Sequence, residues 1–385
     1  MIEKRMILFL LFMSFFSTLL FSQQIQFGET DSYNDLTEGP YIFWEEGKAI
    51  VKYIWNGNYI SEEVAVQEHG DFTVSLGGFD SEFEISSFPP TIDPTIYTNV
   101  PKIFVVSDIH GQYNRFVEIL RGNGILDRNM EWNWGNGHLV IIGDVFDRGP
   151  QVTECLWLIH RLEREAEQWK GKVHFLLGNH EIMVLQGDVR YVHDKYIKVA
   201  EIMGMDVKSL YSDTSELGRW LRSKNTIEVI NNILFVHAGI HPNFTEMNHS
   251  IEEINNRIRV NIDSPREKIK YNDLLNFIFG SIGPFWYRGY FMDTKDEKQI
   301  EQQVLFETLI YMNVTEVVVG HTTQDFINPF FQNKVIPVDT GIKYGNKGEA
   351  LLWKDGIFYR AKVDGYIEQL TFPVKKIQKQ IKENQ

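Results

Sequence analysis

Residues 102–111 read KIFVVSDIHG, and they carry more information about the fold than any other part of the chain. Residues 102–106, with their apolar run, have the composition of a buried strand, and they lead directly into Asp108, His110 and Gly111. Aspartate and histidine are common metal ligands, and glycine lets the backbone turn and approach a ligand closely. The pattern therefore predicts a short strand that ends in a metal-binding loop.

The same arrangement recurs four times farther along the chain. Apolar strands are predicted at 139–142, 173–177, 233–236 and 316–319, and they lead into GDVFDRG (143–149), GNHE (178–181), HAG (237–239) and GH (320–321). Ligands in α/β sheets bind at the carboxyl ends of the strands. One such motif alone also occurs in turns and helix caps, but five of them after five strands predict a single shared site.

The side chains in these motifs suit a pair of divalent metal ions. Aspartate, asparagine and histidine together favour Mn²⁺, Fe²⁺ or Zn²⁺. Two ions need at least one shared ligand, and a carboxylate is the natural bridge. Such a pair, ~3.5–4 Å apart, lowers the pKa of a bridging water and holds both the attacking and the leaving oxygen of an in-line displacement at phosphorus.

The order of the motifs resembles that of the calcineurin-like metallophosphoesterases, and DRG at 147–149 points to their phosphoprotein phosphatase branch. Within that branch the chain looks most like the Shewanella-like protein phosphatases. The stretches that carry this resemblance are LRSKNT (221–226), LFVHAGI (234–240) and GPFWYRG (283–289). The resemblance implies an α/β fold, with a calcineurin-like metallophosphoesterase domain at 100–365 in which central β-sheets are flanked by helices.

The resemblance also implies a role for each residue of the site. The first metal would be bound by Asp108 and His110, the bridge would be Asp144, and the second metal would be bound by Asn179, His237 and His321. His180 would protonate the leaving oxygen, and Asp147 would orient it, which suits the titration range of imidazole. Arg148 and Arg288 would grip the phosphoryl oxygens, because guanidinium binds phosphate through two parallel hydrogen bonds.

One position departs from the wider superfamily. Many metallophosphoesterases carry Gly-His-x-His in the last motif, and the second histidine binds metal, whereas this chain has Thr323. The difference matches the phosphoprotein phosphatase branch and argues against the purple acid phosphatase and nuclease branches. His241 is expected to be a loop residue, because Gly239 and Pro242 exclude the helix that would pair it with His237. Residues 339–341 are expected to close the site.

Other segments are organised around this domain. Residues 23–90 are predicted to form a small β domain, with a hairpin turn at Asn56-Gly57, because both central residues of such a turn need positive φ. Prolines mark a linker at 88–99. Two mainly helical inserts are predicted at 186–226 and 244–310, and a closing hairpin at 351–363. Residues 374–385 are predicted to form a basic, solvated tail.

The N-terminal residues are typical of an export signal. Lys4 and Arg5 precede an apolar run at 6–21, and Ser22 follows as a small residue, so a signal peptide is predicted at 1–22. The apolar run is short for a membrane-spanning helix, which needs ~20 residues. An uncleaved anchor is the alternative. We expect an exported protein, periplasmic or secreted, with no stable membrane span after cleavage of the signal.

Charge and cysteine content exclude several classes of function. Lys and Arg number 38 and Asp and Glu number 52, which gives a formal charge of 38 − 52 = −14. Binding to nucleic acid rests on basic side chains that neutralise phosphates, so nucleic acid is not expected as a partner. Cys155 is the one cysteine, so no intramolecular disulfide can form, and its apolar neighbours predict that it is buried.

These observations predict a two-metal phosphatase that hydrolyses phosphomonoesters, either phosphoprotein or aryl phosphate, by direct attack of a metal-bridging hydroxide. Two rival functions remain open at this stage. Dinucleoside polyphosphate hydrolases share the motif set, and VDTG at 338–341 is similar to their ending. A non-catalytic surface binding module with a structural metal site is the other rival, although such a site would need neither His180 nor the two arginines.

Overall fold

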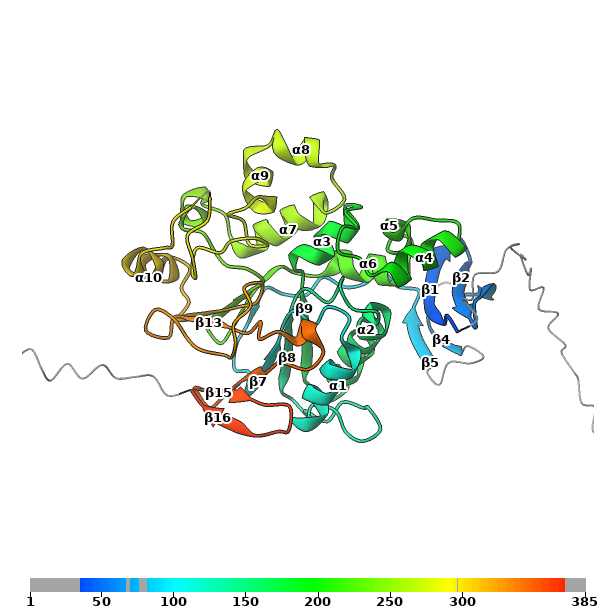
Figure 1. Cartoon of the computed structure of the whole chain (residues 1–385), viewed down its shortest axis with the longest axis horizontal. Coiled ribbons are helices and arrows are strands. Elements are labelled where there is room, and N and C mark those ends of the chain that lie inside the picture. The colour runs from blue at the N-terminus through cyan, green and yellow to red at the C-terminus, as the bar shows by residue number, and fades with distance from the viewer. Residues whose placement is uncertain (1–34, 67–69, 76–81, 296, 371–385) are drawn as a thin grey trace, which may run out of the picture.

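The computed structural model describes residues 35–66, 70–75, 82–295 and 297–370. At its centre lie two β-sheets, one with the strand order β16-β15-β14-β7-β8-β9 and the other with the order β13-β12-β11-β10-β6 (Figure 1). The first sheet consists of β7 (Lys102–Val106), β8 (His138–Ile142), β9 (Lys172–Leu176), β14 (Ala350–Lys354), β15 (Ile357–Ala361) and β16 (Ile367–Gln369). The second consists of β6 (Ile96–Tyr97), β10 (Ile227–Ile230), β11 (Ile233–Val236), β12 (Glu316–Val319) and β13 (Val335–Pro337).

The strands that precede the motifs are parallel to one another within each sheet. In the six-stranded sheet, β7 pairs with β8 and β8 pairs with β9, all in the same direction. In the five-stranded sheet, β11, β12 and β13 are parallel in the same way. The loops that follow these strands therefore leave each sheet at one edge. In contrast, β14 pairs with β15 and β15 pairs with β16 in antiparallel fashion, and β10 is antiparallel to β11.

Both faces of β7 are buried. Ile103 and Val105 of β7 belong to an apolar cluster between the two sheets, to which Phe235 of the other sheet also belongs. Phe104 and Val106 point the other way and belong to the larger cluster that the helices cover. Burial on both faces explains why 103–106 is an unbroken apolar run and not an alternating one.

Helices cover the outer faces of the sheets and form the two inserts. The helices are α1 (Tyr113–Gly122), α2 (Val152–Gln168), α3 (Asn179–Leu185), α4 (Asp194–Ile202), α5 (Val207–Leu210), α6 (Glu216–Ser223), the 3₁₀ helix η1 (Pro242–Met247), α7 (Ile251–Asn261), α8 (Arg266–Lys270), α9 (Asp273–Phe279), α10 (Gln302–Tyr311) and the 3₁₀ helix η2 (Ile342–Tyr344). Figure 1 shows α7, α8 and α9 grouped together at the top of the molecule. None of the helices in the described residues is long and apolar enough to cross a membrane.

The N-terminal strands form two small antiparallel sheets at one end of the molecule, beside α4 and α6 (Figure 1). These strands are β1 (Glu38–Glu45), β2 (Lys48–Trp55), β3 (Asn58–Ala65), β4 (Asp71–Ser75) and β5 (Glu82–Ser86). The Trp157 indole N–H of α2 donates a hydrogen bond to the Pro40 carbonyl at 3.0 Å, and the Trp44 indole N–H of β1 donates to Glu216 of α6 at 2.7 Å. The buried side chains of β1 and β2 are continuous with the cluster under the helices.

Several predicted elements are confirmed. The strands at 102–106, 233–236 and 316–319 have the predicted bounds. Asn56 and Gly57 take positive φ values of 47° and 77°, as the predicted hairpin turn requires. Cys155 is fully buried. Strand β10 lies just after the predicted helical insert and was not predicted. The predicted signal peptide and basic tail lie outside the described residues.

A single carboxylate holds together two of the loops that leave the six-stranded sheet. Glu181, in the first turn of α3, is fully buried and accepts hydrogen bonds from four backbone N–H groups. Three of these groups belong to residues 144–146 after β8, and the fourth belongs to Gly178 after β9, with distances of 2.6 to 3.2 Å. The loop after β8 therefore keeps its shape through the first turn of α3.

We expect Glu181→Gln to lower the free energy of unfolding by about 2–3 kcal/mol, because the side-chain NH₂ group would face backbone N–H donors that lose their acceptor. Urea unfolding followed by circular dichroism measures this loss. Glu252→Gln, at an exposed position of α7, is the matched control and should change stability by less than about 0.5 kcal/mol. Equal stability of the two variants would contradict the role given to Glu181.

Candidate metal centre

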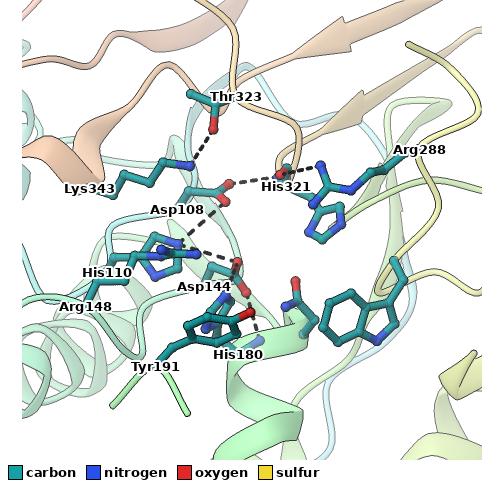
Figure 2. Close-up of a pocket in the computed structure, with 12 residues that line it drawn as sticks. Asp108, His110, Asp144, Arg148, His180, Tyr191, Arg288, His321, Thr323 and Lys343 are labelled. Carbon is teal, nitrogen blue, oxygen red and sulfur yellow. Dashed lines mark hydrogen bonds and ion pairs between the residues drawn. The ribbon is translucent and has the colours of Figure 1, made fainter. Parts of the chain in front are cut away.

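Four of the five motifs line one cavity of about 210 Å³ at the ends of the parallel strands. Asp108, His110, Asp144 and Asn179 follow β7, β8 and β9 of one sheet, whereas His321 follows β12 of the other. Figure 2 shows these loops converging on the cavity, with the Asp144 carboxylate at its centre. His237 of the remaining motif follows β11 and contacts the lining, since its Nε2 is 2.9 Å from the Asn179 side-chain oxygen. The two sheets therefore contribute to one site.

Asp144 is shared between two groups of potential metal ligands. One group consists of Asp144, His110 and His180, and the other consists of Asp144, His237 and His321. Within each group, the potential ligand atoms all lie within 4.8 Å of one another. The two carboxylate oxygens face different histidines, since Oδ2 is 3.6 Å from His110 Nε2 and Oδ1 is 3.3 Å from His237 Nε2. Asp144 therefore has the geometry of a bridging ligand.

The histidines around Asp144 are oriented by the backbone. Nδ1 of His110 donates to the Phe146 carbonyl at 2.7 Å, and Nδ1 of His237 donates to the Ile142 carbonyl at 2.8 Å. In His110 this leaves Nε2 free to face the cavity as a ligand, whereas Nε2 of His237 also lies within hydrogen-bonding distance of the Asn179 side-chain oxygen. Nε2 of His321 is buried and has no hydrogen-bond partner among the described residues. An unpaired buried nitrogen of this kind is costly, and a metal ion would satisfy it.

The charge balance of the cavity also fits metal ions. Burial, together with repulsion from the carboxylates of Asp339 and Asp144, raises the pKa of Asp108 well above its usual range. Burial lowers the pKa of His110 to about 3, so its imidazole is neutral, as a ligand must be. Burial opposes protonation of His237, but the Asp144 carboxylate outweighs it and raises the pKa to about 10. Closely spaced buried carboxylates of this kind are stabilised by positive charge.

Asp108 is held by both sheets. Its Oδ2 accepts the Ser107 hydroxyl hydrogen at 2.6 Å and the backbone N–H of His321 at 3.0 Å. Its Oδ1 lies 3.9 Å from His110 Nε2. The carboxylate is thus fixed beside the ligand group that His110 belongs to.

His180 differs from the other histidines in its partner. Its Nδ1 lies 2.5 Å from the carboxylate of Asp147, which is itself buried. Burial disfavours the charged imidazole, but the carboxylates of Asp144 and Asp147 outweigh this, and the pKa of His180 is raised. His180 Nε2 lies 3.8 Å from Asp144 Oδ2. A carboxylate at Nδ1 stabilises an imidazolium, so the geometry suits a proton donor.

Two arginines lie at the edge of the cavity, on different sides of it (Figure 2). Arg148 is exposed, and its guanidinium lies 5.3 Å from the centre of the Tyr191 ring. Arg288 is half-buried and donates to the Thr322 hydroxyl at 3.2 Å. Both guanidinium groups retain N–H donors that can reach an oxyanion in the cavity.

The chain reaches these positions through left-handed turns. Six residues of the site have positive φ values between 48° and 70°, namely Asp108, His110, Asp144, Asp147, Arg148 and His321. The neighbouring glycines serve two different purposes. Gly143 has a positive φ of 71°. Gly178 and Gly320 have no positive φ, and they are needed because other atoms approach their backbone too closely for a side chain to fit. A Cβ at Gly178 would lie 2.4 Å from Asp144 Oδ1, and a Cβ at Gly320 would lie 2.0 Å from Ser107 Oγ.

All ten site residues expected from the sequence lie in or beside this cavity. Sequence reasoning missed Tyr191, Lys343 and the lining position of Trp286. None of these follows a core strand, so no local pattern indicated them. Thr323, where other branches have histidine, donates to Asp339 at 2.5 Å and also lies 2.5 Å from Lys343 Nζ.

Comparison with known proteins agrees with this geometry. The family model for calcineurin-like phosphoesterases matches residues 101–325. An uncharacterised protein of Schizosaccharomyces pombe is 30% identical over 70% of this chain and 82% of its own length. Shewanella-like protein phosphatase 1 of Plasmodium berghei is 28% identical over 64% of this chain and 69% of its own length.

A solved structure is also similar over most of the chain. The cold-active protein tyrosine phosphatase of a psychrophilic Shewanella species is 37% identical, with a TM-score of 0.81, over 87% of this chain and 100% of that one. Its similarity extends beyond the residues that the family model matches. The chain therefore belongs to the calcineurin-like phosphoesterase family, whose members are phosphoester hydrolases, and it is similar to the Shewanella-like protein phosphatases.

Proposed function

We propose that this protein is a two-metal phosphatase that hydrolyses phosphomonoesters of proteins or of small aryl alcohols. The observation that carries the proposal is the position of Asp144, whose two carboxylate oxygens face separate groups of histidines in a buried cavity. A structural metal site would need only one such group. A shared carboxylate supports a pair of ions, and a pair of ions is suited to displacement at phosphorus.

The donor set fits two divalent ions, Mn²⁺, Fe²⁺ or Zn²⁺. Asp108 and His110 would hold the first ion. The second ion would be held by Asn179, His237 and His321, and Asp144 would bind both ions. When bound, the ions supply an activated water for direct attack on phosphorus and positive charge for the phosphoryl oxygens.

The other polar residues of the cavity supply what the metal ions cannot. Arg148 and Arg288 approach from different sides and would hold the phosphoryl oxygens in line for attack. His180 would donate the proton from Nε2 to the leaving oxygen, and Asp147 would keep Nδ1 protonated and fix the ring. His180 lies as close to Asp144 as a metal ligand would, but its Nδ1 has a different partner. Its Nδ1 lies beside the Asp147 carboxylate, whereas the Nδ1 atoms of His110 and His237 bond to backbone carbonyls.

The dinucleoside polyphosphate hydrolase remains the alternative within the same reaction class. The cavity encloses about 210 Å³ and its lining is mainly charged, which suits a phosphoryl group better than a nucleoside. A panel of phosphotyrosine, phosphoserine and phosphothreonine peptides, dinucleoside tetraphosphate and a phosphodiester, each with Mn²⁺, Fe²⁺ and Zn²⁺, tests the proposal. Turnover of the dinucleotide without turnover of any monoester would support the alternative.

We also propose that the enzyme acts outside the cytoplasm. The support is the order of charged, apolar and small residues over 1–22, which lie outside the described residues. N-terminal sequencing of the protein produced in an exporting host measures whether the segment is removed. An N-terminus close to Gln23 is the expected result, and an intact Met1 would contradict cleavage.

We expect Asp144→Asn to lower kcat at least about a hundredfold, because the neutral amide cannot balance two cations and loses affinity for both. Metal content measured by elemental analysis should fall below that of the unaltered protein after the same loading and gel filtration. Asparagine is nearly isosteric, so the melting temperature of the metal-free protein should stay close to that of the parent. Full activity with unchanged metal content would exclude a bridging role.

We expect His180→Ala to lower kcat by about 10²–10⁴-fold on phosphoserine peptide, because an alkoxide leaves poorly without a proton donor. The loss should be smaller on 4-nitrophenyl phosphate, whose leaving group is stable as an anion. His249→Ala, at a half-buried position outside the cavity, is the control and should leave both rates unchanged. An equal loss on both substrates would show that His180 acts by some means other than proton donation.

A further inference from the structure

One aromatic side chain of the cavity is exposed to solvent although it touches the catalytic residues. Tyr191 is 44% exposed and lines the cavity from the loop between α3 and α4. A large side chain that is half in water is not needed for the core, because it buries too little apolar area. Its exposed surface is therefore available to a molecule that enters the cavity beside it.

The backbone fixes Tyr191 against the second motif. The Arg148 N–H donates to the Tyr191 carbonyl at 2.9 Å, so the loop after α3 is tied to the loop after β8. The guanidinium groups of Arg148 and Arg190 lie 5.3 and 5.7 Å from the centre of the ring. Two cations near one ring restrict its position through attraction to the π system, while the ring still lines the cavity and is partly exposed.

The ring of Tyr191 lies beside the group that would protonate the leaving oxygen. Its centre is 5.3 Å from the centre of the His180 ring, with 52° between the planes (Figure 2). A leaving group whose oxygen reaches His180 Nε2 must pass close to Tyr191. A phenyl leaving group has an aromatic face that can stack on this ring, whereas the short aliphatic chain of a serine or threonine ester has none.

The other aromatic side chain of the lining is placed differently. Trp286 packs edge-on against His321, with 5.8 Å between ring centres. His321 belongs to the group of potential ligands that contains His237, and His180 belongs to the other group. Trp286 therefore lies beside His321, whereas Tyr191 lies beside His180. Of the two, Tyr191 is the one next to the proposed proton donor and hence to the leaving group.

From this geometry we infer that Tyr191 is a specificity-determining residue, which favours aryl over alkyl phosphomonoesters by stacking on the leaving group. The inference rests on the proposed function, because it takes His180 as the proton donor. It names the discriminating residue and the substrate class that this residue selects. Stacking of two rings corresponds to about a three- to tenfold preference.

The test compares Tyr191→Leu, Tyr191→Phe and the unaltered protein, all loaded with Mn²⁺, on two peptides that differ only in phosphotyrosine or phosphothreonine. Tyr191→Leu should lower kcat/KM about three- to tenfold on the phosphotyrosine peptide and less than twofold on the phosphothreonine peptide. Tyr191→Phe keeps the ring and should match the parent on both. Tyr271→Leu, which removes an 86% exposed tyrosine outside the cavity, is the control for surface effects.

An equal loss on both peptides would overturn the inference, because Tyr191 would then only position His180 or Arg148.

A second experiment needs no turnover. Calorimetry measures the binding of benzylphosphonate and butylphosphonate to the same Mn²⁺-loaded variants. Tyr191→Leu should reduce the affinity ratio of the aryl to the alkyl compound by about three- to tenfold, and an unchanged ratio overturns the inference. If the unaltered protein hydrolyses no ester in the panel, the proposed function fails, and the binding arm still decides the role of Tyr191.

Discussion

The site depends on one buried carboxylate that takes no part in the chemistry. Glu181 accepts four backbone N–H groups, and these groups belong to the two loops that carry Asp144 and Asn179. Without such an acceptor, those N–H groups would be buried and unpaired, and the turn after β8 could not keep its shape in the protein interior. The position of the Asp144 backbone relative to α3 is therefore set by a residue whose own side chain does not line the cavity.

The second constraint is the seam between the two sheets. Asp108 and His110 belong to one sheet, whereas His237 and His321 belong to the other. The apolar cluster between the sheets fixes their separation, and the hydrogen bond from the His321 N–H to Asp108 joins their edges directly. Close packing makes such an interior stiff, so the two halves of the proposed metal site can be positioned accurately although more than two hundred residues separate them.

The sequence predicted those parts of the molecule whose signals are local. Strands such as 102–106 are buried on both faces, so their apolar runs stand out, and each motif follows its strand directly. Strand β10 was missed because Ile227–Ile230 follows α6 without a turn signal. Tyr191 and Lys343 were missed because their approach to the cavity depends on how loops outside the motifs pack, which no short pattern records. No pattern in the sequence indicated why residue 178 is glycine. Its lack of a Cβ matters because the side chain of Asp144, which is distant in the sequence, lies beside it.

The left-handed backbone at the site limits how the site can be altered without damage to its scaffold. Glycine, asparagine and aspartate accept that conformation more readily than other side chains, for which it costs about 1–2 kcal/mol. At Asp108 and Asp144, with φ of 53° and 55°, an alanine or valine would remove the carboxylate and distort the turn at once. Forms of the protein that lack one of these carboxylates are therefore best made with asparagine, and a library that excludes glycine, asparagine and aspartate there would select against folding before it could report on catalysis.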